Sequence, residues 1–269
     1  MNKNKFDIIK IGGSVITDKL SYKKLNSDSL NSISEVIAKW GHKSIIVHGA
    51  GSFGHILAEK HSITSGFTEF SQLDGIVQIR LDMTDLTKKV VESLQNNKLQ
   101  AVSFQTSSIV YSQGTENKLN YFIEPIQKAL DLGLLPVLSG DVIFKQEKGF
   151  SIYSGDALID LLVQLFDIRN VYFISDVDGL FVRDSDTHKM ELVERIESKQ
   201  LSTIELSDFS DKKTIDVTGK MKGKIDDIKS ISQHVERVVI VNGSYPERIS
   251  LLLSGDKAIC TTIIGEKST

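Results

Sequence analysis

Four turns that contain glycine each follow a β-branched segment of this 269-residue chain, at residues 10–14, 48–55, 139–141 and 176–179. In an open parallel sheet the carboxyl ends of the strands share one edge, so turns that are distant in sequence converge on one crevice. Glycine lets backbone N–H groups approach an anion closely, and the N-terminus of a following helix adds about half a positive charge. Several such turns on one edge predict a binding site for a polyphosphate.

Lysines at two places could supply positive charge to such a site. Lys10 ends the first predicted strand, directly before Gly12 and Gly13. A buried, unpartnered ammonium is costly, so a bound anion explains Lys10 better than packing; the alternative is an edge strand on which Lys10 faces solvent. Lys220 and Lys224 lie one helical turn apart at the start of a predicted helix, where like charges are unfavourable unless an anion is bound. Phosphoryl transfer depends mainly on such positioned charge.

The second turn also matches motifs from other classes of protein. Residues 49–54 have the spacing of the dinucleotide-binding G-x-G-x-x-G, which needs an acidic residue about 20 positions on, at the end of the next strand. Residues 61–73 contain no credible strand, which disfavours this interpretation. Residues 50–54 also resemble a relaxed nucleophile elbow, in which Ser52 would be a hydrolase nucleophile. Its candidate histidine partners, His188 and His234, fall in a polar segment and at a helix end, which disfavours this interpretation. Walker A and protein-kinase motifs are absent from the sequence.

Elsewhere, short β-branched runs alternate with longer segments of helical periodicity, which is typical of a mostly parallel sheet with helices on both faces. Strands are predicted at residues 6–11, 44–47, 101–104, 134–138, 171–175, 238–241 and 258–263. Helices are predicted from about residue 28, after the turn at 49–54, and at 72–94, 121–132, 156–166, 221–234 and 247–253. The long helix at 72–94 is marked by Leu73, Ile76, Val77, Leu81, Leu86, Val90 and Leu94. Residues 141–153 alternate like a hairpin, and the polar residues 184–216 are typical of a looser insertion.

Composition limits the class of protein. The chain has 32 basic and 35 acidic residues, a net charge of −3, and 40% apolar residues. These values exclude disorder and collagen, and they lack the cationic excess that a nucleic-acid or membrane-surface protein needs. No run reaches the ~18 apolar residues of a membrane span, and the N-terminus has too few for a signal peptide. Cys260 is the one cysteine, so we expect no intramolecular disulfide and a reducing compartment, which indicates a cytoplasmic protein. The length of 269 residues and the alternating segments predict a single-domain α/β protein.

Together these segments resemble the amino acid kinase superfamily and, within it, the isopentenyl phosphate kinases. The matching motifs occur in that family's order, at residues 10–19, 48–55, 139–142, 154–156, 176–179 and 216–224, and they span nearly the whole chain. The resemblance implies a three-layer αβα fold with an acceptor lobe at about 1–167 and a nucleotide lobe at about 168–269. It also implies transfer of the γ-phosphoryl group of Mg-ATP to isopentenyl phosphate, a step of isoprenoid biosynthesis.

The resemblance assigns a role to each matching residue. Lys10 and Lys224 would bind the ATP phosphates and offset charge on the transferred group, and Lys19 would assist. His55 would bind the acceptor phosphate, whose negative charge favours the protonated, donating imidazole. The backbone contacts to the acceptor would come from Ala50, Gly51, Gly140 and Gly155. The ATP side would comprise Lys10, Gly12, Gly13, Ser14, Gly51, Asp176, Asp178, Gly179, Gly219, Lys220 and Lys224.

ATP and Mg²⁺ are the expected cofactors, and a homodimer is expected from the resemblance alone. No protein ligand is assigned to the metal: Asp141, Asp156 and Asp178 are candidates, and ATP phosphates with water could hold the ion instead. Lys220 stands where the family has a second glycine. It would either disturb a close backbone approach to ATP or add a phosphate contact.

Two other functions fit the same residues. A fosfomycin-type phosphonate kinase shares an anionic phosphorus acceptor and could use His55, whereas carboxylate kinases give this histidine no obvious role. A nucleotide-binding or storage module without turnover is the non-enzymatic alternative, against which the retained lysines and His55 argue. An isoprenoid acceptor would need an apolar pocket. Its plausible lining residues, each equally typical of core, are Phe67, Ile76, Ile79 and Ile152.

Overall fold

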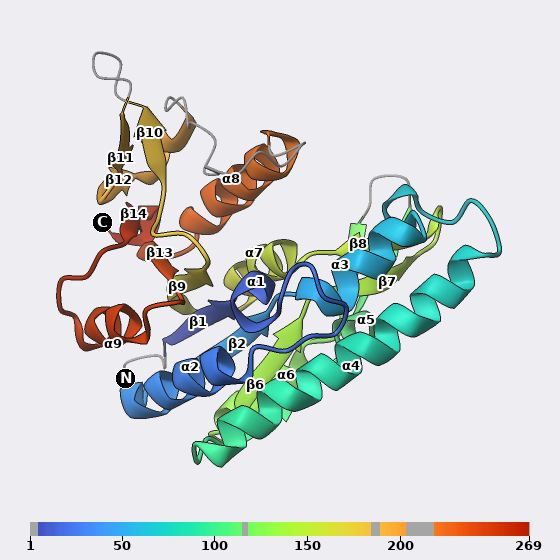
Figure 1. The fold of residues 1–269 in the computed structure, drawn as a ribbon, viewed down its shortest axis with the longest axis horizontal. Helices are drawn as coiled ribbons and strands as arrows, with labels where there is room; N and C mark the ends of the chain where they lie inside the picture. The colour runs from blue at the N-terminus through green and yellow to red at the C-terminus, as the bar shows by residue number, and fades with distance from the viewer. Residues whose placement is uncertain (1–4, 115–117, 184–188, 203–217, 269) are drawn as a thin grey trace.

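The computed structural model describes residues 5–114, 118–183, 189–202 and 218–268, which are built around an eight-stranded sheet (Figure 1). Its strands are β1 (Phe6–Ile11), β2 (Ser44–His48), β3 (Ala101–Ser103), β6 (Leu135–Ser139), β9 (Ile168–Ser175), β12 (Arg195–Glu197), β13 (Arg237–Asn242) and β14 (Thr261–Ile264). Their order is β12-β14-β13-β9-β1-β2-β6-β3. Every neighbouring pair is parallel except β13 and β14, which confirms the predicted mostly parallel sheet.

Helices cover both faces of the sheet, as predicted, and make three layers. One face carries α2 (Ser27–Trp40), α3 (Gly51–Lys60), α4 (Gln72–Asn96) and α9 (Pro246–Ser254). The other face carries α6 (Glu124–Asp131), α7 (Gly155–Leu165) and α8 (Thr218–Ser232). Shorter turns are α1 (Gly13–Ile16), α5 (Thr106–Ile109) and the 3₁₀ turns Ile63–Ser65, Ser198–Ser202 and Glu266–Ser268. Within the described ranges, no helix combines the length and apolar character needed to cross a membrane.

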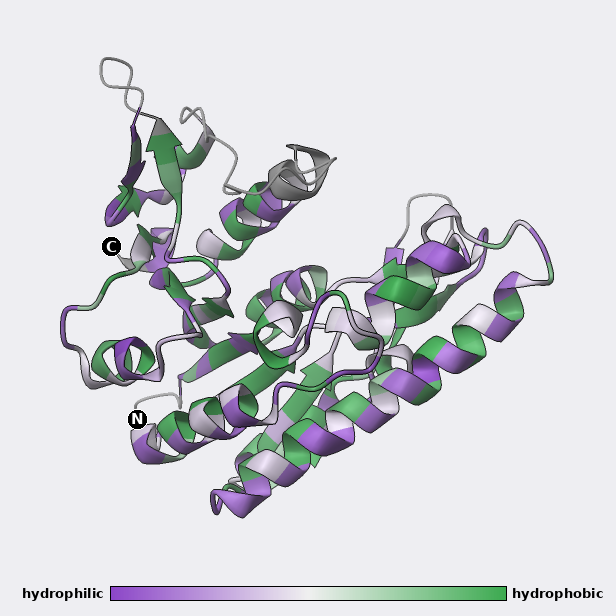
Figure 2. Cartoon of the chain, in the orientation of Figure 1, coloured by the Kyte–Doolittle hydropathy of each residue, from purple (hydrophilic) through white to green (hydrophobic). Residues whose placement is uncertain are grey.

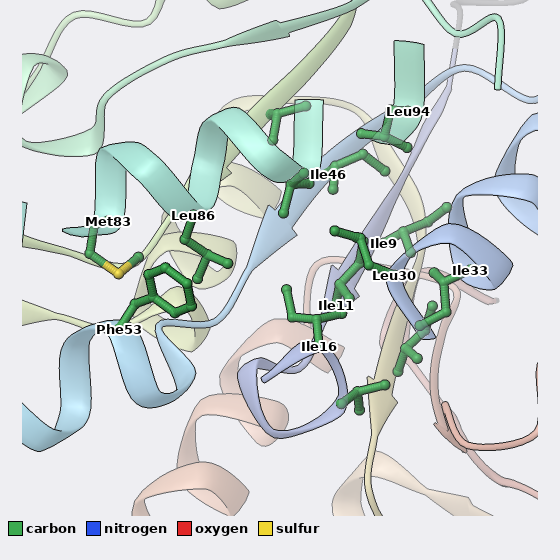
Figure 3. Packing of buried hydrophobic residues seen from close by; sticks show 14 of the residues in the cluster. Ile9, Ile11, Ile16, Leu30, Ile33, Ile46, Phe53, Met83, Leu86 and Leu94 are labelled. Atoms are coloured by element: carbon green, nitrogen blue, oxygen red, sulfur yellow. The ribbon is translucent and has the colours of Figure 1, made fainter. Parts of the chain in front are cut away.

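Alternation along β1 decides where its lysine lies. Ile9 and Ile11 pack with residues of α2, α3 and α4 in the cluster shown in Figure 3. Phe6 and Ile8 pack on the opposite face, among residues of α7 and α8. Because successive side chains of a strand point to opposite faces, Lys10 faces the same side as Ile8. The central strands are mostly hydrophobic (Figure 2), although β1 also carries Asp7, so Lys10 is a charged group near the end of a mostly apolar strand.

A second, four-stranded sheet has the order β5-β4-β7-β8. It contains β4 (Val110–Gln113), β5 (Lys118–Tyr121), β7 (Asp141–Lys145) and β8 (Gly149–Tyr153). The predicted hairpin at residues 141–153 is confirmed, since β7 and β8 pair antiparallel. The prediction of a helix from residue 121 is wrong at its start. Tyr121 ends a strand that pairs with β4, and α6 begins three residues later.

Two further sequence expectations need correction. Residues 189–197 lie in the segment expected to be loose, but β11 (Met190–Leu192) pairs with β10 (Phe181–Arg183), and β12 joins the main sheet. In α4, Leu73, Val77 and Leu81 are exposed and do not face the core. They repeat every four residues along the outer side of the helix, as regularly as the buried side does. The buried apolar stripe of α4 is Ile76, Ile79, Met83, Leu86, Val90 and Leu94.

A buried carboxylate fastens the loop between α1 and α2 to α4. Asp82 is fully buried and accepts hydrogen bonds from the Tyr22 hydroxyl at 2.5 Å and the Gln78 amide at 2.8 Å. The Lys23 ammonium lies 3.0 Å from the same carboxylate, and this hydrogen bond raises the pKa of Lys23. The loop held in this way also carries Lys19. Asp82 therefore links a core helix to a predicted phosphate-binding lysine.

We expect Asp82→Ala to lower the free energy of unfolding by about 1–3 kcal/mol, because it leaves hydrogen-bonding groups of Tyr22 and Lys23 without their shared partner. Asp85→Ala is the matched control, since the half-exposed Asp85 lies 3.4 Å from Lys23. A change below about 0.5 kcal/mol is expected for the control. Urea unfolding of both variants measures the difference, and equal losses would show that burial of Asp82 contributes nothing.

Candidate active site

A cavity of about 170 Å³ opens at the carboxyl edge of the main sheet. Its lining includes Lys10 from β1, His55 from α3 and Asp156 from α7, together with residues of the turns that follow β2 and β6. Turns far apart in sequence therefore converge on one crevice, as the parallel sheet predicts. The residues that line the cavity are Lys10, Gly49, Ala50, Gly54, His55, Ala58, Ile79, Met83, Gly140, Asp141, Val142, Ile152, Tyr153, Ser154, Gly155 and Asp156.

The lining of the cavity also includes apolar side chains. Ile79 and Ile152 are among them, as the sequence suggests. Ile76, by contrast, is buried in the core, and Phe67 is exposed outside the lining. Sequence analysis missed four lining residues, which come from α3, α4, β7 and β8: Ala58, Met83, Val142 and Tyr153. The lining thus combines charged groups with apolar side chains that suit a hydrocarbon.

The turns after β1 and β2 are in backbone contact. A Cβ placed on Gly13 would lie 2.2 Å from the Gly51 nitrogen, far inside van der Waals distance. Gly51 also has a φ of +50°, in the left-handed region that favours glycine. The turns after β6 and β8 are similarly close, since a Cβ on Gly140 would lie 2.9 Å from the Gly155 nitrogen. Glycine at these positions lets the turns meet around the cavity mouth.

The carboxylate of Asp156 attracts two lysines from different elements, Lys10 of β1 and Lys224 of α8. The Lys10 ammonium forms an ion pair with Asp156 in the first turn of α7 and lies 5.3 Å from the centre of the Phe173 ring. The alternative of a solvent-facing Lys10 on an edge strand is wrong, since β1 is central and the side chain is 12% exposed. Burial lowers the pKa of Lys224, and repulsion from Lys10 adds to this effect. An added anion would relieve that repulsion.

Asp176, directly after β9, gathers two other predicted site residues. It accepts hydrogen bonds from the Ser14 hydroxyl at 2.9 Å and from the Lys19 ammonium at 2.5 Å. Burial raises the pKa of Asp176, but Lys19 and Ser14 more than offset this, and the net shift is downward. Asp178 is used differently, because Asn242 and Arg248 donate to its carboxylate at 2.9 and 2.7 Å. Its contacts tie the turn after β9 to the end of β13 and the first turn of α9.

The carboxylates near the cavity do not form a metal site. Asp141 accepts from the backbone N–H groups of Val142 and Ser107, Asp156 pairs with Lys10, and Asp178 is held as described above. In the described part of the chain, no three His, Cys, Asp or Glu side chains are grouped to hold an ion. These residues therefore do not fit a resident Mg²⁺. The surroundings of Gly219 and the side chain of Lys220 lie outside what the structure describes, and the effect of Lys220 stays a prediction.

Residues 5–242 match the amino acid kinase family. The chain belongs to this family. An isopentenyl phosphate kinase from Thermoplasma acidophilum is 30% identical over 96% of this chain and 99% of its own length. One from Methanocaldococcus jannaschii is 30% identical over 93% and 95%. A crystal structure of an isopentenyl phosphate kinase substrate complex matches with a TM-score of 0.78 and 27% identity, covering 96% of this chain and 99% of the other. The family and the αβα fold predicted from the motifs are confirmed.

Asp227 is a titratable group of this kinase that the sequence did not single out. It lies on α8, three residues after Lys224. Burial raises the pKa of Asp227 to about 6, and repulsion from Asp156 and Asp160 on α7 adds to the shift, against an opposing effect of Lys10. The folded protein therefore holds a proton on Asp227 at pH values where the unfolded chain has released it.

From this shift we expect the contribution of Asp227 to stability to fall as the pH rises from about 4 to about 6, because the native state then binds more protons than the unfolded state. Above pH 6 the loss is complete. Asp227→Asn should therefore raise the Tm at pH 7.5 and leave it nearly unchanged at pH 4. The exposed neighbour Asp226→Asn is the control. Calorimetry across this range measures the effect, and an equal change in Tm at both pH values would contradict it.

Proposed function

We propose that this protein transfers the γ-phosphoryl group of ATP to isopentenyl phosphate and releases isopentenyl diphosphate and ADP, a step of isoprenoid biosynthesis. The observation that carries the proposal is one cavity whose lining combines His55 and Lys10 with the apolar side chains of Ile79, Met83 and Ile152. A phosphate monoester with a short hydrocarbon tail has the same division of polarity. The full-length similarity to isopentenyl phosphate kinases supports this choice.

In this proposal the two substrates bind on opposite sides of strand β1. On one side lie β2, β6 and the acceptor cavity, within residues 1–167; on the other lie β9 and β13, within residues 168–269, which we assign to the nucleotide. Acceptor contacts would come from His55 and the backbone of Ala50, Gly51, Gly140 and Gly155. Nucleotide contacts would come from the remaining predicted residues on the turns after β1 and β9 and from α8.

The acceptor needs no general base. A phosphate monoester has a second pKa of about 6, so near neutral pH its oxygen is already an anionic nucleophile. That oxygen attacks the γ-phosphorus, the bond from this phosphorus to the β,γ-bridging oxygen breaks, and ADP leaves with the electron pair. Lys10 and Lys224 offset the charge on the transferred group, with Lys19 assisting from the Asp176 side. His55 in its imidazolium form donates to the acceptor phosphate and holds it in line.

ATP would enter as its magnesium complex, since the carboxylates of the described residues are not grouped into a resident site. The metal is then part of the substrate, held by ATP phosphates and water. A homodimer and a cytoplasmic location belong to the same proposal. The dimer rests on the resemblance to the family, and the location rests on the lone Cys260.

We expect ATP consumption with isopentenyl phosphate to exceed that with dimethylallyl phosphate or fosfomycin, measured as ADP release under identical conditions. The preference over fosfomycin follows from the apolar side chains in the lining, and the preference over dimethylallyl phosphate rests on the similarity to isopentenyl phosphate kinases. Preference for fosfomycin would replace the proposal with a phosphonate kinase. ADP release with none of the three would favour a nucleotide-binding module.

We expect His55→Gln to lower kcat/KM for isopentenyl phosphate by about 100-fold or more, because a charged donor to the acceptor phosphate is lost. ATP binding, measured by calorimetry, should stay within about threefold of the wild type, since His55 lines the acceptor cavity. His234→Gln, in the segment between α8 and β13, is the control and should leave both values unchanged. A near-normal kcat/KM for His55→Gln would remove this residue from the acceptor site.

A further inference from the structure

The hydroxyl of Thr17 joins the two glycine turns that the proposed function assigns to different substrates. Thr17 directly follows α1 and is 3% exposed. Its Oγ1 donates to the Gly13 carbonyl at 2.8 Å and accepts the Ser52 backbone N–H at 3.0 Å. Gly13 belongs to the turn after β1, and Ser52 lies in the first turn of α3. One buried side chain therefore bridges the start of two elements that face different ligands.

The packing around this hydroxyl leaves little freedom. A Cβ on Gly51 would lie 2.1 Å from Thr17 Oγ1 and 2.8 Å from the Gly13 carbonyl oxygen. The Thr17 backbone N–H also donates to Gly13 at 2.9 Å, and Thr17 forms an isolated antiparallel bridge with Leu25. Thr17 is thus fixed by its own backbone. Because its hydroxyl accepts the Ser52 N–H, it also fixes the position of Ser52 in the other turn.

Thr17 is almost fully buried, which leaves it little surface for either proposed substrate. The described residues that line the acceptor cavity do not include it, and its hydroxyl hydrogen is used by Gly13. Any effect on the reaction must therefore act through the two turns. In-line transfer is sensitive to such an effect, because the reacting atoms must approach to about 3–3.5 Å and a misplacement of about 1 Å can cost ~100-fold in rate.

We propose that Thr17 is a positioning residue that sets the separation between the γ-phosphoryl group of bound ATP and the acceptor phosphate. The inference rests on the proposed phosphoryl transfer. The Thr17 hydroxyl holds the N-terminal turn of α3, which carries His55 one turn further on, against the turn that follows Lys10. Without the hydroxyl, each turn can still bind its own ligand, but the two ligands are no longer held at one fixed distance.

Thr17→Val removes the hydroxyl at nearly constant shape, and Thr17→Ser restores it without the methyl group. For Thr17→Val we expect kcat to fall by about 10–100-fold, while the Kd values of ATP and of isopentenyl phosphate, each measured alone, change by less than about threefold. Thr17→Ser should keep kcat within about threefold of the wild type. If Thr17→Val does not fold, Thr17→Cys, whose thiol is a weak donor and acceptor, takes its place with the same expected split.

Three results would overturn the role of Thr17: an unchanged kcat in the variant that lacks the hydroxyl, a rise in either Kd as large as the fall in kcat, or a kcat for Thr17→Ser as low as that of Thr17→Val. The wild-type rate tests the proposed function separately. If the wild type uses another phosphorus acceptor in the screen, the ratio of variant to wild type is measured with that acceptor. A wild-type chain that transfers phosphate to none of them overturns both proposals.

Discussion

The proposed site depends on the contact between the turns that follow β1 and β2. The two strands pair in register through Ile11 and His48, so both chains leave the sheet at the same level. The chains can then turn side by side only if no side chain stands between them, and a Cβ on Gly13 would collide with the Gly51 backbone. This contact fixes where α3 begins. The start of α3 in turn places His55 in the lining of the cavity that Lys10 also lines.

Charge in the free protein is balanced locally, although the net charge of −3 gives no hint of an anion site. Asp156 holds Lys10 and Asp176 holds Lys19, each across more than a hundred residues of sequence. These carboxylates keep the lysines in place when no phosphate is present. Lys224 is the contrasting case, since burial and Lys10 lower its pKa. A bound polyphosphate compensates this unfavourable burial, which favours binding where cations from several elements meet.

The parallel sheet and its glycine turns could be predicted because β-branched runs and glycines are local signals. The ion pairs could not, because nothing local links Lys10 to Asp156. Strands β4 and β5 were not predicted because each is only four residues long and partly exposed, so neither has a clear hydrophobic pattern. Pairing of β4 with β5 and with β7 stabilises them. Helix α4 shows a different limit. Leu81 and Met83 are equally apolar, and only the tertiary structure decides that Met83 lines the cavity while Leu81 faces solvent.

The position of Lys10 explains how one side chain can serve both halves of the proposed reaction. Its backbone lies between the ladders with β2 and β9, where it is paired with Val47 and Phe173. The Cα position is therefore fixed from both sides, and only the flexible side chain can move. In the free protein the ammonium contacts Asp156 and also lines the acceptor cavity. In the proposed reaction this side chain would leave the carboxylate for the phosphoryl group, while its backbone stays paired with the strands on both sides.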